Sequence, residues 1–274
     1  MENFMKTRII TAVVALLIFI PVLIFANTTL IEVGNFNIRL INLAFALLSL
    51  VGVYESAKCV GEVKTLSFFP IYLVSFILPL LTYGDMGFYT PVFMFLLFYM
   101  LFVAVIKNKS VTSDKALVLL ALTFYVTSSF GAMTVLYVTE IKFFPLIFIG
   151  AWVTDTFAYF SGYFFGKHKL IPAVSPKKTV EGAVGGSLVT TITFAIYAYF
   201  MAKDIKTALI FAVIGLVTSV VSQFGDLAAS LVKRCYGIKD YGNLFPGHGG
   251  VLDRFDSILA VSAFLYITTL FINF

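Results

Sequence analysis

The feature that most constrains this chain is a series of nine apolar stretches, each long enough to form a helix that crosses a lipid bilayer. Such a helix needs about 20 mostly apolar residues, and charges, glycine or proline bound every stretch. The predicted spans are Ile9–Ala26, Leu40–Ala57, Leu66–Thr82, Phe88–Ile106, Ala116–Val138, Phe143–Gly166, Ala183–Ala202, Ala208–Val232 and Phe255–Phe274. Because no segment between them is long enough for a soluble domain, we expect one all-α polytopic membrane domain over residues 1–274.

Composition agrees with a membrane protein. The chain is 60% hydrophobic and only 12% charged, whereas soluble chains are about 45–50% apolar and about 25% charged. So few polar side chains could not cover the surface of a water-soluble globular enzyme. The first stretch follows Lys6 and Arg8, as a signal peptide would, but Ile24-Phe25-Ala26 is not a small-x-small cleavage site. We therefore expect an uncleaved first helix.

The basic residues indicate how the helices are oriented. A net charge of +5 in a soluble protein would raise the question of nucleic acid, but in a membrane protein lysines and arginines accumulate in cytoplasmic loops. With the N-terminus in the cytoplasm, fifteen of the 19 basic residues fall in inner segments and four in outer ones. The sequence thus predicts a multi-pass protein of the cell (cytoplasmic) membrane, with its C-terminus outside and no nucleic-acid partner.

Two long inner loops concentrate the polar chemistry. The segments 167–182 and 233–254 carry eight of the fifteen inner basic residues and both histidines, His168 and His248. We therefore interpret residues 1–142 as an N-terminal helical scaffold and residues 143–274 as a catalytic half that faces the cytoplasm.

Four acidic residues lie where lipid penalises a charge. A carboxylate as deep as Asp155, near the middle of the sixth span, costs roughly 2.5–3.5 kcal/mol on insertion scales, so it should face a polar partner. Asp226 lies in the eighth span, and Asp253 and Asp256 share a face at the start of the ninth. These last three would repel one another unless a cation lay between them, which predicts an Mg²⁺ site with a second cation as an option. The alternative is a set of salt bridges that join helices.

Groups suited to phosphate accompany these acids. His248 lies in the run Pro-Gly-His-Gly-Gly (246–250), where glycine lets the backbone approach an anion closely. The other loop brings hydroxyls and two lysines to the entrance of the seventh span, where an anion can bind. The basic and hydroxyl residues expected to bind phosphate are Lys233, Arg234, Lys239, Arg254, Ser175, Lys177, Lys178 and Thr179. The lysines could instead serve only to orient the helices in the membrane. Acidic residues suited to a metal and basic residues suited to phosphates on the same face, however, together indicate metal-assisted phosphoryl or nucleotidyl transfer.

Two pairs of glycines are spaced for helix packing. Gly162 and Gly166, and likewise Gly182 and Gly186, have the GxxxG spacing that permits close approach of helices in a membrane. We expect a packing role for them.

One run of 27 residues carries a longer motif. It reads Ser230-Leu-Val-Lys233-Arg234, then Lys239-Asp240, then Phe245-Pro246-Gly247-His248-Gly249-Gly250-Val-Leu-Asp253-Arg254-Phe-Asp256. This run resembles the signature of the phosphatidate cytidylyltransferase (CDP-diacylglycerol synthase) family, without departure from the pattern. Segments 155–156, 166–169 and 175–182 also look like family segments. The resemblance covers the C-terminal half, whereas the N-terminal helices agree only in being hydrophobic.

The resemblance implies that CTP and phosphatidate react, with a divalent metal, to give CDP-diacylglycerol and pyrophosphate. The expected partners are CTP from the cytosol, phosphatidate in the inner leaflet, and membrane lipid. The expected catalytic residues are Asp226, Asp253, Asp256, His248, Lys233 and Arg234, the three aspartates as metal ligands, and the expected substrate-binding residues are Ser175, Lys177, Lys178, Thr179, Lys239, Arg254 and Asp155. His248 either orients a phosphate or protonates a leaving oxygen.

Two other functions compete with this one. A transporter of a phosphorylated solute would also place acids inside the membrane, but the sequence has no internal repeat and its polar residues gather at one face. A CTP-dependent enzyme similar to polyprenol kinases is the nearer rival, and the full signature argues against it. The sequence leaves open whether two copies pair as a homodimer.

Overall fold

The structure is a computed structural model that describes residues 11, 13–14, 17, 19–33, 36–61, 66–107 and 112–272. Within these ranges the chain is mainly helical, which confirms the predicted all-α class. It divides into two compact units. Unit 1 comprises Met1–Thr139 and Tyr236–Arg254, and unit 2 comprises Glu140–Cys235 and Phe255–Phe274.

The described helices follow the predicted spans closely. Their bounds are α2 Leu40–Val60, a 3₁₀ turn η1 at Leu66–Phe68, α3 Phe69–Leu81, α4 Tyr89–Ile106, α5 Ser113–Val138, α6 Phe144–Phe165, α7 Val180–Ala202, α8 Ile205–Cys235 and α9 Leu252–Thr269. The first predicted span begins outside the described residues, and residues 19–24 are helical.

Six of these helices, α2 and α4 to α8, are long and apolar enough to cross a membrane. The helix α3 is shorter, at 13 residues, and α9 carries three charged residues in its first two turns. The chain is therefore a multi-pass membrane protein. The count of nine spans and the orientation stay predictions.

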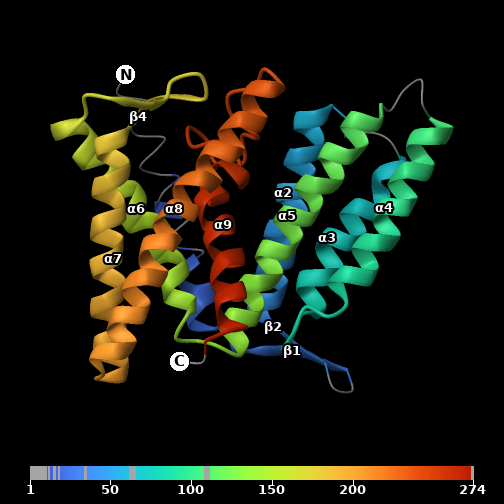
Figure 1. Cartoon of the computed structure of the whole chain (residues 1–274). Helices are drawn as coiled ribbons and strands as arrows, with labels where there is room; N and C mark the ends of the chain where they lie inside the picture. The colour runs from blue at the N-terminus through green and yellow to red at the C-terminus, as the bar shows by residue number, and fades with distance from the viewer. Residues whose placement is uncertain are drawn as a thin grey trace. The chain divides into compact units, whose positions relative to one another are not determined.

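In unit 1, helices α2, α3, α4 and α5 pack side by side (Figure 1). Phe45 on α2 and Phe130 on α5 are fully buried and face each other with ring centroids 6.1 Å apart. The strands β1 (Thr29–Val33) and β2 (Phe36–Arg39) form an antiparallel hairpin that leads directly into α2. At the start of α2, the Asn42 amide donates to three carbonyl oxygens at the end of α3, 2.6–3.5 Å away, and so joins the two helices.

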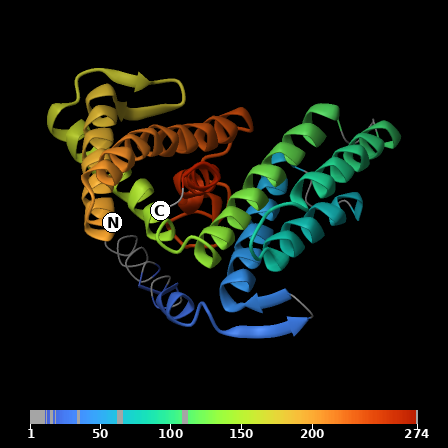
Figure 2. The same ribbon diagram turned by 60° about the horizontal axis from the view of Figure 1, so that its bottom comes forward.

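In unit 2, α7 packs against both α6 and α8, and α6 also contacts α8 (Figure 2). The predicted inner loop 167–182 is largely an antiparallel hairpin of β3 (Lys169–Ile171) and β4 (Ser175–Thr179), which contacts α6 and α7. This hairpin is the main element that the sequence did not predict, because the segment has no run of alternating apolar residues.

Polar caps make α7 and α8 start three residues earlier than their apolar patterns. The Thr179 hydroxyl accepts a hydrogen bond from Gly182 N at 3.1 Å, so α7 begins at Val180. The Asp204 carboxylate accepts bonds from the Thr207 amide and hydroxyl, both at 2.9 Å, and α8 begins at Ile205. These bonds lower the pKa of Asp204, because they stabilise its charged form.

Glycines on α7 let the backbones of α6 and α7 come into direct contact. A Cβ on Gly182 would lie 2.6 Å from the Ala158 carbonyl oxygen, and one on Gly186 would lie 2.7 Å from that of Thr154. Between the same helices the hydroxyls of Thr154 and Thr190 are 2.8 Å apart and hydrogen-bonded. The predicted packing role of the glycine pairs is confirmed for this contact.

Candidate active site

Three acidic side chains from three helices of unit 2 form one group. Asp155 on α6, Asp226 on α8 and Asp256 on α9 lie close enough for their negative charges to repel one another. The Ser257 hydroxyl donates to Asp155 Oδ2 at 3.2 Å, while the Ser257 amide donates to Asp256 Oδ1 at 2.9 Å. Ser257 thus connects two of the acids directly.

A lysine from the β3–β4 hairpin neutralises part of this group. Lys178 Nζ lies 2.6 Å from Asp226 Oδ2, and both side chains are about one-quarter exposed. The same ammonium donates to the Gln223 carbonyl oxygen at 3.4 Å. Lys178, one residue before the Thr179 cap, is therefore a predicted phosphate-binding residue that forms an ion pair with a predicted metal ligand.

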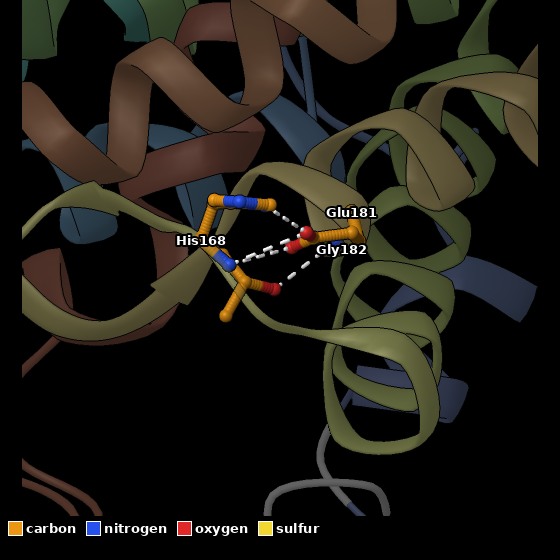
Figure 3. Close-up of polar contacts among 4 residues, drawn as sticks. His168, Glu181 and Gly182 are labelled. Atoms are coloured by element: carbon orange, nitrogen blue, oxygen red, sulfur yellow. Dashed lines mark hydrogen bonds and ion pairs between the residues drawn. The ribbon is translucent and has the colours of Figure 1, made fainter.

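Hydrogen bonds between His168 and Glu181 join the β3–β4 hairpin to the start of α7. His168 Nδ1 lies 2.6 Å from Glu181 Oε1, and the His168 amide donates to both oxygens of the same carboxylate at 3.2 Å (Figure 3). The Val180 amide donates in turn to the His168 carbonyl oxygen at 2.9 Å. These bonds fix both ends of the hairpin, and hence the strand that carries Lys178.

The remaining basic residues differ in exposure. Lys233 is buried, with 8% of its surface exposed, and interacts electrostatically with Asp256. It belongs to α8, which extends to Cys235, so Lys233 and Arg234 occupy the last turn of a helix rather than a loop. The exposed cations of the predicted set are Lys177, Arg234, Lys239 and Arg254, and Ser175 is half-buried.

The glycine-rich run folds into a tight loop in unit 1. The Phe245 amide donates to the Gly249 carbonyl oxygen at 2.9 Å, and the His248 amide donates to that of Phe245 at 2.8 Å. Gly247 and Gly249 have φ of 77° and 88°, values that disfavour other residues. His248 Nδ1 is a buried atom with no hydrogen-bond partner in the described part of the chain, so it retains the capacity to bind a ligand.

Two carboxylates hold this loop. Asp253 Oδ2 accepts hydrogen bonds from the Tyr241 amide at 2.7 Å and the Gly250 amide at 2.9 Å. Glu55 on α2 accepts from the Val251 and Leu252 amides, both at 2.9 Å. Glu55 was not among the residues predicted to be functional, although an acid inside the predicted span Leu40–Ala57 is a signal that could have identified it.

The predicted metal ligands are distributed over the two units. Asp226 and Asp256 belong to unit 2, whereas Asp253 belongs to unit 1, three residues before Asp256 on α9. Among the described residues, no three His, Cys, Asp or Glu side chains form a group that could hold a metal ion. The donor chemistry still suits Mg²⁺, which binds through one or two carboxylates together with substrate phosphates. One turn before Asp226 on α8, the Ser222 hydroxyl is buried and has no hydrogen-bond partner in the described ranges.

Comparison with known proteins identifies the family. Residues 6–272 match the cytidylyltransferase family. The chain belongs to that family. A phosphatidate cytidylyltransferase of Staphylococcus haemolyticus (strain JCSC1435) is 34% identical over 286 aligned positions, which cover 96% of this chain and 98% of the relative. A protein of the same name from Staphylococcus aureus (strain COL) is 33% identical over the same shares. The predicted family is confirmed, and neither the transporter nor the polyprenol kinase alternative is favoured.

Proposed function

We propose that this cytidylyltransferase converts CTP and phosphatidate to CDP-diacylglycerol and pyrophosphate at the membrane. The observation that carries the proposal is similarity over nearly the whole chain to relatives named phosphatidate cytidylyltransferase. The acids and lysines within and beside apolar helices support it, because the reaction joins a water-soluble nucleotide to a lipid.

The reaction needs positioning and charge neutralisation more than covalent help from the protein. An oxygen of the phosphatidate phosphate attacks the α-phosphorus of CTP in line, and the bond from that phosphorus to the bridging oxygen of the β-phosphate breaks. Pyrophosphate leaves with the bonding electrons. No general base is needed, since a phosphate monoester is largely ionised at neutral pH.

The basic residues would bind phosphate groups of the two substrates. Lys178 and Lys233 are the best placed, because each already interacts with a carboxylate of the unit 2 group. Ser175, Lys177, Arg234, Lys239 and Arg254 would add contacts from more exposed positions. His248 would direct to a phosphate oxygen its Nδ1, which has no hydrogen-bond partner among the described residues.

We include a divalent cation, with Mg²⁺ as the expected ion, in the proposal. Asp226 and Asp256 would hold it, with Asp253 as the third expected ligand, and the ion would supply neutralisation of the phosphate charge. Binding that depends on substrate phosphates accords with the lack of a group of three such ligands among the described side chains.

We further propose that the site faces the cytoplasm. Glu55 lies one turn before Lys58, near the end of α2 predicted to be cytoplasmic, and it contacts the start of α9. The ends of two predicted spans that should share one side of the membrane are therefore in contact, which supports the orientation derived from the basic residues.

The test is an assay of the purified protein with radiolabelled CTP and phosphatidate, with and without Mg²⁺. We expect a lipid-extractable cytidine product and release of one pyrophosphate per product, both dependent on the cation. Uptake of a phosphorylated solute into liposomes without any turnover of CTP would overturn the proposal.

A further inference from the structure

Glu55 is an acidic residue buried deep in α2. Only 4% of its surface is exposed, and it lies 16 residues into a helix that is apolar enough to cross a membrane. A charged carboxylate in such a place costs several kcal/mol unless partners stabilise it. The identity of those partners therefore indicates what the residue does.

The partners are two backbone amides at the start of α9. The Val251 amide donates to Glu55 Oε1 and the Leu252 amide to Oε2, each at 2.9 Å. The first amides of a helix have no acceptor within that helix, and a negative charge at this end is favourable. One carboxylate thus satisfies two amides that the helix itself leaves unpaired.

The loop is shaped around this carboxylate. A Cβ on either Gly242 or Gly250 would overlap the Glu55 carboxyl group. Gly250 is the last residue of the glycine-rich run, so at least one glycine of that motif is required for contact with α2. A longer residue at position 250 would displace either the loop or Glu55.

Glu55 and Asp253 together accept hydrogen bonds from four backbone amides of the site in unit 1, three of which are consecutive. Asp253 accepts from the Tyr241 and Gly250 amides, and Glu55 accepts from the next two amides along the chain. His248 lies two residues before Gly250, the first of the three consecutive amides. The position of His248 and of the start of α9 therefore depends on a side chain almost 200 residues earlier in the sequence.

We propose that Glu55 is a positioning residue for the cytidylyl-transfer site. It acts by holding the glycine-rich loop and the first turn of α9, and hence His248 and Asp253, in the geometry required for reaction. This inference rests on the proposed function. It also assigns to the N-terminal helices a part in catalysis beyond that of a scaffold.

The first test compares Glu55→Gln with Glu55→Asp in the full-length purified protein. Gln has nearly the same shape but opposes one loop amide with its own NH₂ group, so we expect kcat to fall on the order of 10- to 100-fold, since small misplacement of reacting groups costs this much. KM for CTP should change less than kcat. Asp keeps the carboxylate on a shorter stem and should recover part of the lost kcat.

Asn42→Ala is the matched control. Asn42 is equally buried, lies on the same helix and bonds to three backbone carbonyl oxygens, but these belong to the end of α3 and to Thr82. We expect this variant to lower the thermal unfolding temperature while kcat is retained. If Glu55→Gln and Asn42→Ala lost activity in the same proportion to stability, Glu55 would be an ordinary structural contact and the proposal would be wrong.

A second readout does not depend on turnover. Amide hydrogen exchange of peptides covering residues 241–253 should be faster in Glu55→Gln than in the wild type, with little change in α3 and α4. Wild-type exchange together with wild-type kcat in this variant would overturn the inference. Failure of the proposed function would look different, because the wild-type protein would then form no cytidine lipid at all.

Discussion

Two carboxylates of unit 1, Glu55 and Asp253, differ in their partners from two carboxylates of unit 2, Asp155 and Asp226. Glu55 and Asp253 accept hydrogen bonds from four backbone amides. Asp226 instead pairs with the ammonium of Lys178, and Asp155 with the hydroxyl of Ser257. Backbone amides cannot leave without refolding of the loop, whereas a lysine on a flexible stem can exchange one anion for another.

This difference suggests a division of labour. The acids of unit 1 determine the shape of a loop, and those of unit 2 can change partners when a cation or a phosphate arrives. Substitutions in the two units should accordingly differ in whether they affect stability or turnover.

The largest effect is expected for Asp226→Asn. Loss of this charge removes a cation ligand and the partner of Lys178, so we expect turnover of CTP to fall by on the order of 10²- to 10³-fold. The folded protein should still be extractable with an unchanged unfolding temperature. Asp204→Asn, which alters an exposed helix cap in the same unit, is the control and should keep its turnover. Full activity of an Asp253→Asn, Asp256→Asn double variant would rule out the metal assignment.

Asp253→Ala should cost more stability than the corresponding substitution in unit 2, and this pair of variants gives the clearest stability difference between the two units. It leaves the Tyr241 and Gly250 amides without an acceptor, and a buried unpaired amide costs about 1–3 kcal/mol. We expect a lower free energy of unfolding, measured by thermal or denaturant unfolding in detergent. Asp226→Ala should destabilise less, because it relieves repulsion among three acids. Equal losses in both variants would contradict the division of labour.

Lys178→Met should reduce kcat/KM roughly tenfold, since a hydrogen bond to a charged group is worth about 1.5–3 kcal/mol. The loss should appear mainly as a higher KM for a phosphate-bearing substrate, because the ammonium would no longer bind phosphate. Steady-state kinetics with each substrate varied in turn measure this. Lys206→Met, in a predicted outer segment, is the control. Unchanged KM values for both substrates would show that Lys178 serves only to neutralise Asp226.

Asp155→Asn should have the smallest effect, a decrease in turnover of a few-fold. The amide can still accept the bond from Ser257, so only the negative charge is lost. Wild-type kinetics in this variant would show that Asp155 only contributes to contacts between helices.

The sequence predicted most of the helices because lipid imposes a simple rule on length and apolarity. Residues 40–57, 88–106, 116–138 and 143–166 were assigned to spans within a few residues of the helices observed. The starts of α7 and α8 were predicted three residues late, since the caps Thr179 and Asp204 are polar and lie outside the apolar runs.

The site was predictable only where residue type reveals chemistry. The proximity of Asp226 to Asp256 was predicted from acids placed within apolar segments, but with Asp253 as their third member; the proximity of Asp155 to both was not predicted. The pairing of Lys178 with Asp226 could not be predicted, because it depends on the β3–β4 hairpin and its register. The role of Glu55 was hidden for another reason: its partners are backbone amides, which every residue but proline possesses.

One face of helix α6 packs against α7, whereas the other exposes large aromatic side chains. Because of this, the lipid around the protein should affect its activity. On one face of α6 its backbone carbonyls lie against Gly182 and Gly186 of α7. Elsewhere it exposes large aromatic rings, among them Tyr159, Tyr163 and Phe164. Since the same helix carries Asp155, the thickness of the surrounding bilayer should influence the depth at which this acid lies. Activity should therefore vary with acyl-chain length in a series of defined vesicles, even when the substrate stays the same.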